Sequence, residues 1–417
     1  MRRVFQHGAY ADRALHAEAD RARLEPRERA LARRLAYGAI QRRATLDHVI
    51  ARLAERDPER LDPTLRVALW VGLYELLYLD SAAEHAAVDQ AVELAKLEHP
   101  KGAGLVNAVL RRATREARAL LDALDDETPE RAAIRHSHPE WIAALWWEAL
   151  GPVQARTLMA ANNEPAESAL RANTLVTGAG ALAAALAAEG VATRPAPSLP
   201  EGLVAEGRFD AFHSPLWAAG AFMPQSRGSM LVAKTLDPRP GERVLDLCAA
   251  PGAKTTHIAA LMGDSGQVVA VERHEGRSEA LKRTCSRMRI TSVEVVLADA
   301  TRFRGEGFDR VLVDPPCSGL GTLRSRPDLR WRMGEERMVG LVAEQTAILD
   351  VAAGATRPSG VLVYSTCTIS AAENERQIAS LLERHPAFEV ADSMQLLPHR
   401  DGTDGFFIAR LRNARSQ

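Results

Sequence analysis

The chain has 417 residues, with 53 lysines and arginines against 54 aspartates and glutamates, so its formal net charge is −1. This balance excludes a globally basic protein, and four cysteines are too few for the disulfide framework of a small secreted domain. The length allows two or three domains, and 46% hydrophobic residues suffice for a sizeable core.

The start of the chain indicates where the protein resides. Its first ten residues are polar and basic, and no apolar stretch reaches the roughly 18 residues that a bilayer-spanning helix needs. We see no signal peptide and no cysteine framework, a pattern typical of a reducing compartment. We therefore expect a cytoplasmic protein.

Residues 1–125 are predicted to form an all-helical domain. Apolar residues recur there at helical spacing, and short breaks with Asp-Pro or His-Pro steps separate the segments. The predicted helices are Arg29–Arg42, Leu46–Ala54, Thr64–Leu79, Ala86–Glu98 and Gly104–Arg118.

Residues 126–214 are predicted to be a linker followed by a small mixed α+β region. Asp122–His138 is polar, as is typical of a linker. The stretch Pro139–Arg208 contains Ala- and Leu-rich helical segments, with Trp141–Leu150 as a core helix, and one candidate strand at Ala169–Asn173.

Residues 215–417 alternate strands with helices, which predicts a Rossmann-like α/β domain with a seven-stranded, mostly parallel sheet. Five buried parallel strands are expected, and a final antiparallel pair completes the sheet. The five are Arg243–Ala249, Gln267–Glu272, Val293–Ala298, Phe308–Asp314 and Gly360–Tyr364, and the pair is Phe388–Ala391 with Gly405–Leu411.

The turn after the first of these strands indicates the cofactor. It reads Asp246-Leu-Cys-Ala-Ala-Pro-Gly-Ala-Lys, with a single glycine, whereas a dinucleotide fingerprint uses three so that backbone can approach a pyrophosphate. S-adenosylmethionine carries no phosphate, so one tight turn suffices. Glu272 can accept from ribose hydroxyls and Asp299 from the adenine amino group. Together on successive strand tips, these acids favour S-adenosylmethionine.

Two of the four cysteines follow successive predicted strands. Cys317 ends the run that begins at Phe308, and Cys367 ends the run that begins at Gly360. Ligands and chemistry gather at the carboxyl ends of strands in an open α/β sheet, so this placement predicts nucleophilic chemistry. The four cysteines form no C-x-x-C pair, and we expect no metal site.

Four motifs resemble those of the NOL/NOP/Sun family of RNA 5-methylcytosine methyltransferases, in matching order from about residue 139 to the end. They are Asp246-Leu-Cys-Ala-Ala-Pro-Gly-Ala-Lys-Thr, Asp314-Pro-Pro-Cys-Ser-Gly-Leu-Gly, Arg326-Pro-Asp-Leu-Arg-Trp and Tyr364-Ser-Thr-Cys-Thr. The N-terminal helices resemble a NusB-like RNA-binding domain through Leu69-Trp-Val-Gly-Leu-Tyr, His85-Ala-Ala-Val-Asp-Gln and Gly104-Leu-Val-Asn-Ala-Val. The fusion is similar to bacterial Sun/RsmB-like members of the family, which methylate a cytosine of small-subunit (16S) ribosomal RNA.

The resemblance implies the chemistry of the cysteines. Carbon 5 of cytosine is a poor nucleophile until a thiolate adds to carbon 6. In the family the Thr-Cys cysteine is the nucleophile and the Pro-Cys cysteine assists product release, which assigns Cys367 and Cys317. Enzymes that make the same base in DNA attack from a Pro-Cys position, so Cys317 remains the alternative nucleophile.

Further residues are expected in the site. The resemblance directs Lys254 into it, and Asp314 could donate to N3 of cytosine or, as a carboxylate, lie near the sulfonium. The predicted cofactor-binding residues are Cys248, Ala249, Ala250, Pro251, Gly252, Ala253, Lys254, Glu272, Arg277, Asp299 and Asp314. The residues predicted to contact RNA, unless they form only a charged surface loop, are Arg324, Arg326, Arg330 and Arg332.

Two local patterns need a structural interpretation. Ala253 stands where the family usually has glycine; if that position requires a positive φ, alanine costs on the order of 1 kcal/mol. Ser370-Ala-Ala-Glu373 is typical of a capping box at the start of the helix after Cys367, so Glu373 is expected to be structural.

Three functions remain open at this point. The leading hypothesis is an S-adenosylmethionine-dependent cytosine-5 methyltransferase of ribosomal RNA that acts on an unstacked base. A monomer is favoured, but the oligomeric state is left open. The second is a base amino methyltransferase, against which the thiol pair argues. The third is an RNA-binding assembly factor whose catalytic domain is vestigial.

Overall fold

The computed structural model describes residues 1–79, 83–207 and 209–415, and the chain divides into two compact units. The first unit consists of Met1–Pro165 and Leu323–Gly334, and the second of Ala166–Thr322 and Glu335–Gln417. Both units are therefore discontinuous in sequence. The predicted limit at Arg208 lies outside the described residues.

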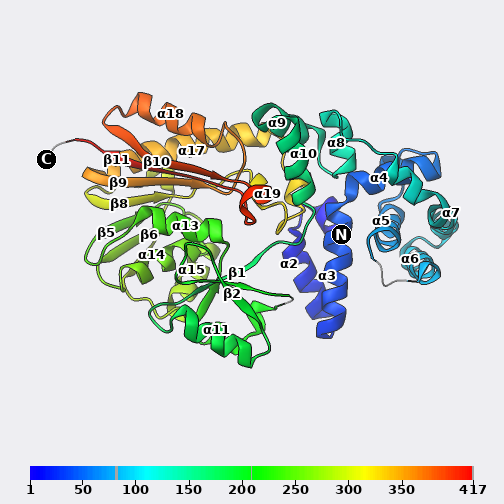
Figure 1. Ribbon diagram of the computed structural model, residues 1–417, viewed down its shortest axis with the longest axis horizontal. Helices are drawn as coiled ribbons and strands as arrows, with labels where there is room; N and C mark the ends of the chain where they lie inside the picture. The colour runs from blue at the N-terminus through cyan, green and yellow to red at the C-terminus, as the bar shows by residue number, and fades with distance from the viewer. Residues whose placement is uncertain (80–82, 208, 416–417) are drawn as a thin grey trace. The chain divides into compact units, whose positions relative to one another are not determined.

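The described part of the first unit is helical (Figure 1). Its helices are α1 (Arg2–His7), α2 (Ala11–Arg21), α3 (Pro26–Gln41), α4 (Arg43–Ala54), α5 (Pro63–Tyr78), α6 (Glu84–Glu98), α7 (Ala103–Asp122), α8 (Pro129–Arg135), α9 (Glu140–Leu150), α10 (Pro152–Ala161) and α16 (Leu329–Arg332), with 3₁₀ turns η1 (Pro58–Arg60) and η2 (Pro100–Gly102). The five predicted bundle helices are confirmed as α3 to α7. The short helices α1 and α2 had not been predicted.

Helix α5 lies in the core of the bundle because apolar residues occupy nearly all of its faces. Leu69 and Leu73 are completely buried there. Gly72 brings the neighbouring helices close: a β-carbon at this position would lie 2.7 Å from Leu110 Cδ1 of α7 and 2.9 Å from Ala91 Cβ of α6. A glycine that weakens an isolated helix thus permits the packing of three helices.

The predicted linker Asp122–His138 is wrong in part, because α8 forms within it. Thr128 caps this helix by accepting a hydrogen bond from Arg131 N, and Pro129 occupies its first turn. A threonine N-cap followed by proline is a helix start, whatever the polarity of the flanking residues. Ala132 and Ala133 are buried on its inner face.

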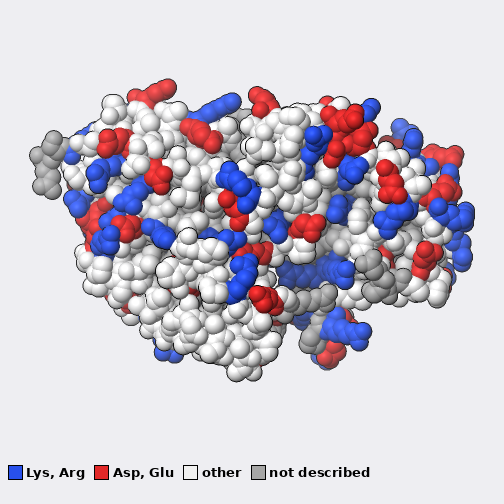
Figure 2. Space-filling model, viewed as in Figure 1, with Lys and Arg blue, Asp and Glu red and all other residues white. Residues whose placement is uncertain are grey.

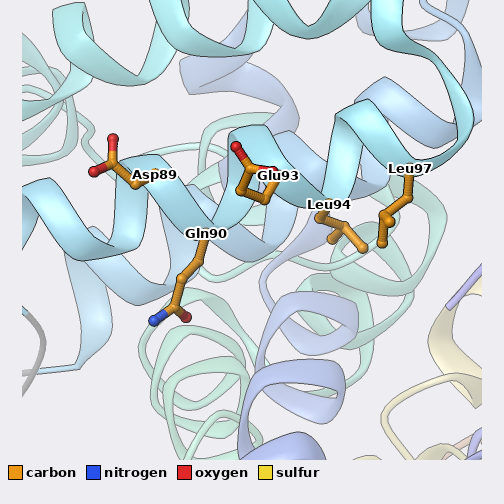
Figure 3. A pocket seen from close by; sticks show the side chains of 5 residues that line it. All are labelled: Asp89, Gln90, Glu93, Leu94 and Leu97. Carbon is orange, nitrogen blue, oxygen red and sulfur yellow. The ribbon is translucent and has the colours of Figure 1, made fainter.

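Acidic and basic side chains are interleaved on the visible surface of each unit (Figure 2), in keeping with the near-zero net charge. A pocket of about 420 Å³ lies along α6 in the first unit and is lined by Asp89, Gln90, Glu93, Leu94 and Leu97 (Figure 3). Carboxylates and leucines do not suit a phosphate, and none of these residues is a predicted site residue.

The second unit begins with a small antiparallel sheet of order β2-β3-β1-β4 in its described residues. Its strands are β1 (Ser168–Ala172), β2 (Thr193–Pro195), β3 (Gly202–Ala205) and β4 (Phe222–Pro224), and α11 (Ala179–Ala188) packs against it. Leu182 and Leu186 of α11 share an apolar cluster with Leu170 and Phe222 of the sheet. The predicted strand at residues 169–173 is confirmed as β1.

A second sheet of seven strands, counted over the described residues, has the order β10-β11-β9-β8-β5-β6-β7. The strands β5 to β9 pair in parallel, and β10 and β11 are antiparallel. Their bounds are β5 (Arg243–Asp246), β6 (Gln267–Glu272), β7 (Val293–Leu297), β8 (Phe308–Val313), β9 (Thr356–Thr366), β10 (Phe388–Leu396) and β11 (Phe406–Asn413). The predicted α/β fold and its antiparallel pair are confirmed, although β9 and β10 are longer than expected.

Helices cover both faces of this sheet (Figure 1). One apolar cluster joins the sheet to α13 (Arg227–Leu236), α14 (Ala253–Leu261) and α15 (Glu275–Arg287), and the other joins it to α17 (Glu335–Ala355) and α18 (Glu375–Arg384). The remaining elements are α12 (Pro215–Ala218), α19 (Pro398–Asp401), η3 (Ala211–His213), η4 (Ala300–Arg302) and η5 (Leu320–Thr322). Two buried faces explain the continuous apolar runs of the central strands.

Helix α17 corrects the expectation that no stretch is long and apolar enough to cross a bilayer. It has 21 residues and passes that test by length and composition alone. Its buried side chains, including Ile348, Leu349 and Ala352, pack on the sheet beside β8 and β9. The core helix of a folded domain passes the same test, and a third of the apolar window of α17, 33%, is buried inside the protein.

Candidate active site

Cys317 and Cys367 lie side by side in the second unit. Cys367 directly follows β9, Cys317 lies in the loop after β8, and these two strands pair in parallel with Val313 opposite Tyr364. The two Sγ atoms are 3.4 Å apart, and both residues are half-buried. The two thiols therefore lie together at one edge of the sheet, as the sequence predicts.

Lys254 and Asp314 form an ion pair at the same edge. Lys254, in the first turn of α14, donates from Nζ to Asp314 Oδ2 at 2.7 Å, and Ser365 Oγ donates to Asp314 Oδ1 at 2.9 Å. Burial opposes the charge on Lys254, but the neighbouring Asp314, the hydrogen bond to it and the negative form of Cys367 together raise its pKa above 10.5. Lys254 is thus an ammonium at neutral pH.

The environment of Cys317 keeps its proton in place. Its hydrogen bond with Cys367 and its burial, with smaller contributions from the charges of Glu373 and Asp314, raise the pKa of Cys317 well above 9.0. A thiol that remains protonated can donate a hydrogen bond to a neighbouring thiolate. The charge of Lys254 interacts with the thiol of Cys367, so a positive group lies near the two sulfur atoms.

The turn between β5 and α14 is tight at Gly252. This residue has a φ of 105°, and a β-carbon there would lie 2.7 Å from Leu281 Cδ1. Ala253 is the first residue of α14 and has no positive φ. The strain considered for Ala253 is therefore absent, because the glycine that the turn requires is Gly252.

The acids of the predicted cofactor site occupy the ends of β6 and β7. Glu272 is 4% exposed, accepts from His274 N at 2.8 Å and lies 3.4 Å from Arg277 Nε. Arg277 also donates to Ala250 O of the turn. Asp299 is exposed and already accepts from Thr301 N and Oγ1, and these bonds lower its pKa.

Asp246, at the end of β5, holds an unpaired acceptor in this region. Its Oδ2 accepts from Thr255 Oγ1 at 2.8 Å, while Oδ1 is buried without a hydrogen-bond partner among the described residues. Burial raises the pKa of Asp246 to about 6. A buried oxygen of this kind can be satisfied by the ammonium of an amino-acid ligand. Together with the glycine turn and Glu272, it fits an amino-acid nucleoside such as S-adenosylmethionine.

The arginines around Trp331 belong to the first unit, and one of them corrects a prediction. Arg330 is completely buried, and its guanidinium donates to the carbonyls of Gln41, Ser137, Asn162 and Leu323 and to Asn163 Oδ1. It therefore anchors its segment and does not present a charge to RNA.

The other three arginines of this segment differ in exposure. Arg324 donates to Pro165 O, and Arg332 lies 3.9 Å from the ring centroid of Tyr10 and 3.8 Å from Asp328 Oδ2. Arg326 is exposed. For these three, RNA contact stays a prediction.

The capping box predicted at Ser370–Glu373 is wrong. Helix α18 begins at Glu375 with Asn374 as its N-cap and no side-chain cap. Glu373 is completely buried and accepts hydrogen bonds from Ser318 and Gln345 instead. Its role is structural as expected, but its partners lie in the loop of Cys317 and on α17.

Sequence reasoning missed two polar residues of the site. Ser365 holds Asp314, and Gln345 donates to Glu373 and to Pro316 O beside Cys317. Ser365 lies within the quoted motif beginning at Tyr364, two residues before Cys367, so its position carried a signal. Gln345 stands in the middle of an apolar helix, where a buried amide points to polar partners.

Three family models match successive parts of the chain. The model of the 16S rRNA methyltransferase RsmB/F family matches residues 233–412, that of the NusB family residues 2–115, and that of the RsmF/B-like ferredoxin-like domain residues 138–211. These ranges cover the α/β sheet with its helices, the helical bundle, and most of the small antiparallel sheet with the helices before it.

Relatives and solved structures extend the match. A probable ribosomal RNA small subunit methyltransferase B from Synechocystis sp. is 37% identical over 99% of this chain and 98% of its own. Ribosomal RNA small subunit methyltransferase B from Thermus thermophilus is 37% identical over 94% of this chain and 90% of its own. The crystal structure of PH0851 has a TM-score of 0.81 at 28% identity and covers 93% of this chain and 90% of that one.

A further solved structure resembles this chain in fold. It is NSun6 from Pyrococcus horikoshii with SFG, with a TM-score of 0.62 at 24% identity, covering 67% of this chain and 99% of that one. The matched family models and the identities of the relatives show that the chain belongs to the RsmB/F family of 16S rRNA methyltransferases.

Proposed function

We propose that this protein methylates carbon 5 of a cytosine in small-subunit ribosomal RNA, with S-adenosylmethionine as the methyl donor and a covalent bond from Cys367 to carbon 6 as the intermediate. The observation that carries the proposal is the 3.4 Å separation of Cys317 Sγ and Cys367 Sγ beside the Lys254–Asp314 pair. Adjacent thiols and a lysine–aspartate ion pair serve this reaction, whereas methylation of an amino group needs no thiol.

The cofactor would lie against the turn at Gly252. Glu272 suits the ribose hydroxyls, the buried Oδ1 of Asp246 suits the ammonium, and Arg277 supports the turn through Ala250 O. S-adenosylmethionine supplies an electrophilic methyl group when bound there. The remaining predicted contacts, from Cys248, Ala249, Pro251 and Asp299, belong to the same proposal.

Side chains of this protein carry out the addition to the cytosine and the later release of the product. The thiolate of Cys367 adds to carbon 6 and makes carbon 5 nucleophilic. The Asp314–Lys254 pair holds an exchangeable proton near N3, where negative charge develops. After methylation, a base takes the carbon 5 proton, the electrons of that C–H bond restore the carbon 5–carbon 6 double bond, and Cys367 leaves as a thiolate. Cys317, still a thiol, assists this release by donating a hydrogen bond to the departing sulfur.

The RNA partner follows from the same chemistry. The cytosine must leave its stack to expose carbon 6, so the substrate is a single-stranded or flipped base in ribosomal RNA. The NusB-like domain, residues 126–214 and Arg324, Arg326 and Arg332 supply RNA contacts. We assign the protein to the cytoplasm as a monomer, with domain limits at residues 125 and 214.

The test compares three cysteine variants with ribosomal RNA and labelled cofactor. We expect Cys367→Ala to lose 5-methylcytosine formation, because the attacking sulfur is gone. We expect Cys317→Ala to accumulate a protein–RNA adduct that resists denaturation, because release is blocked. Cys285→Ala, on α15 and buried in the apolar core, is the control and retains activity, because Cys285 has no part in the proposed reaction.

Two outcomes would overturn this proposal in different ways. An adduct that accumulates in Cys367→Ala instead would make Cys317 the nucleophile. Absence of 5-methylcytosine with the unmodified protein, on naked 16S RNA and on small-subunit particles, would leave an RNA-binding assembly factor as the function.

A further inference from the structure

The residues that directly follow the two cysteines touch each other. Ser318 comes after Cys317, Thr368 comes after Cys367, and their hydroxyl oxygens are 2.6 Å apart. Both side chains are completely buried. Backbone joins the same loops, since Gly321 N donates to Cys367 O at 3.0 Å. The short distance between the sulfur atoms is therefore accompanied by two further bonds between their loops.

The carboxylate of Glu373 accepts hydrogen bonds from Ser318 in the loop of Cys317. Its Oε1 accepts from Ser318 N at 2.8 Å, its Oε2 accepts from Ser318 Oγ, and Gln345 Nε2 donates to Oε1 at 3.0 Å. The same Gln345 amide donates to Pro316 O at 2.9 Å. Glu373 and Gln345 together hold the residues on both sides of Cys317.

The chemistry of the groups sets the direction of each bond. A carboxylate has no proton to give, so the Ser318 hydroxyl donates to Glu373. Ser318 Oγ then has only acceptor capacity left, so the Thr368 hydroxyl must donate to it. The chain of bonds runs in one sense, from the loop of Cys367 to the loop of Cys317 and on to the buried carboxylate.

A fully buried carboxylate needs a reason, since its desolvation is costly unless hydrogen bonds compensate it. Glu373 does not cap α18, which starts two residues later without a side-chain cap. Its side-chain donors are Ser318 and Gln345 among the described residues. Asn374, the next residue, accepts from Thr366 Oγ1 and donates to Thr368 O, on either side of Cys367.

We propose that Glu373, Ser318 and Thr368 form a positioning network that sets the separation of Cys317 and Cys367. Its consequence for catalysis rests on the proposed function, in which the two sulfurs act in successive steps. All three side chains are completely buried, so the proposal gives them no contact with the base. They act through the loops, and a displacement of about 1 Å in such a loop can lower a rate about 100-fold.

The test removes one hydroxyl and restores it. Thr368→Val deletes the donor to Ser318 at nearly constant volume, whereas Thr368→Ser keeps it. Thr356→Val is the matched control. Thr356 is a buried threonine like Thr368, but it is the first residue of β9, whereas Thr368 follows the last, and its hydroxyl donates to Ala352 O.

The first readout needs no methylation. Diamide takes two hydrogen atoms from two adjacent thiols, which join as a disulfide while diamide becomes the hydrazine. Mass spectrometry of the Cys317–Cys367 peptide pair gives the rate. We expect Thr368→Val to slow this rate about three- to tenfold, and Thr368→Ser and Thr356→Val to match the unmodified protein.

The second readout is steady-state methylation of 16S RNA. We expect Thr368→Val to lower kcat about tenfold with both KM values within about twofold, and Thr368→Ser to restore kcat. Glu373→Gln, which removes the charge at constant shape, should act in the same direction. If Glu373→Gln does not fold, the threonine variants carry the test alone.

The possible results separate this inference from the proposed function. An unchanged diamide rate in Thr368→Val, or an equal loss in Thr356→Val, overturns the positioning network. A slowed diamide rate in a protein that makes no 5-methylcytosine would keep the network and reject the proposed function.

Discussion

At the scale of the residue, burial decides which groups near the cysteines carry charge. Lys254 stays charged because Asp314 offsets its desolvation, and Cys317 stays protonated because it is hydrogen-bonded and buried. The two thiols therefore differ in their surroundings. Residue type alone could not distinguish them, since the sequence left Cys317 open as an alternative nucleophile.

Burial of the Asp246 carboxylate, in contrast, destabilises the folded protein. Its folded pKa is about 6 against an ordinary 3.8, because burial disfavours the carboxylate. Between these values the folded state binds the proton more tightly than the unfolded state. Stability therefore falls as pH rises from 3.8 through 6, and the full cost, about 3 kcal/mol, is present above pH 6.

We predict that Asp246→Asn stabilises the unliganded protein at neutral pH and weakens the binding of S-adenosylmethionine. Urea unfolding should show a gain of up to about 3 kcal/mol at pH 8 that shrinks toward pH 4. Calorimetric titration with the cofactor measures the loss of affinity. Asp392→Asn, at an exposed position on β10, is the control without a gain. A gain of equal size at every pH would contradict the assignment to this carboxyl.

At the scale of the element, the site is built where parallel strands end. Periodicity and apolar runs predicted β5 to β9 well, because a strand buried on both faces must be apolar along its length. Acids and thiols that follow such runs necessarily reach one edge. Ser365, Gln345 and Glu373 could not be placed in the same way, because their partners lie far apart in sequence.

The turn at Gly252 shows a limit of local reasoning. Sequence comparison within the motif drew attention to Ala253, but only the backbone reveals that Gly252 alone carries the positive φ. In the same way, the arginine-rich segment 324–332 predicts RNA contacts or a charged surface loop. Its Arg330 instead satisfies carbonyl groups in the interior, a role that no local pattern indicates.

We predict that Arg330→Met destabilises the first unit by about 3–5 kcal/mol, because buried carbonyl groups lose their donor. The measurement is urea-induced unfolding followed by tryptophan fluorescence, to which Trp331 in the same helix contributes. Arg326→Met is the matched control in the same segment and should leave stability unchanged, since Arg326 is exposed. Equal stability of the two variants would contradict the anchoring role of Arg330.

At the scale of the whole molecule, neither unit is a continuous stretch of chain. Leu323–Gly334 belongs to the first unit, although it lies between β8 and α17 of the second in sequence. There Trp331 Nε1 donates to Ile40 O at 2.7 Å, and Asp328 Oδ2 accepts from Ala11 N at 3.2 Å. The segment thus completes the packing of the helical unit.

We predict that residues 1–165 alone are less stable than the same fragment joined by a flexible linker to residues 323–334. Each restored hydrogen bond contributes about 1 kcal/mol, so the fusion should gain about 2–5 kcal/mol in urea unfolding after the cost of ordering the segment. The fusion with Arg330→Met serves as its control and should lose most of the gain. A fragment 1–165 as stable as the fusion would show that the segment is dispensable for this unit.

The amino-acid sequence by itself determined the α/β sheet, the helical bundle, the family and the placement of two thiols after successive strands, because each depends on periodicity, strand order or a contiguous motif. The tertiary structure alone decided the 3.4 Å contact of the sulfurs, the burial of Arg330 and Glu373 and the discontinuous units. These features depend on pairs of residues distant in the chain, whose distances and desolvation are set only when the elements pack.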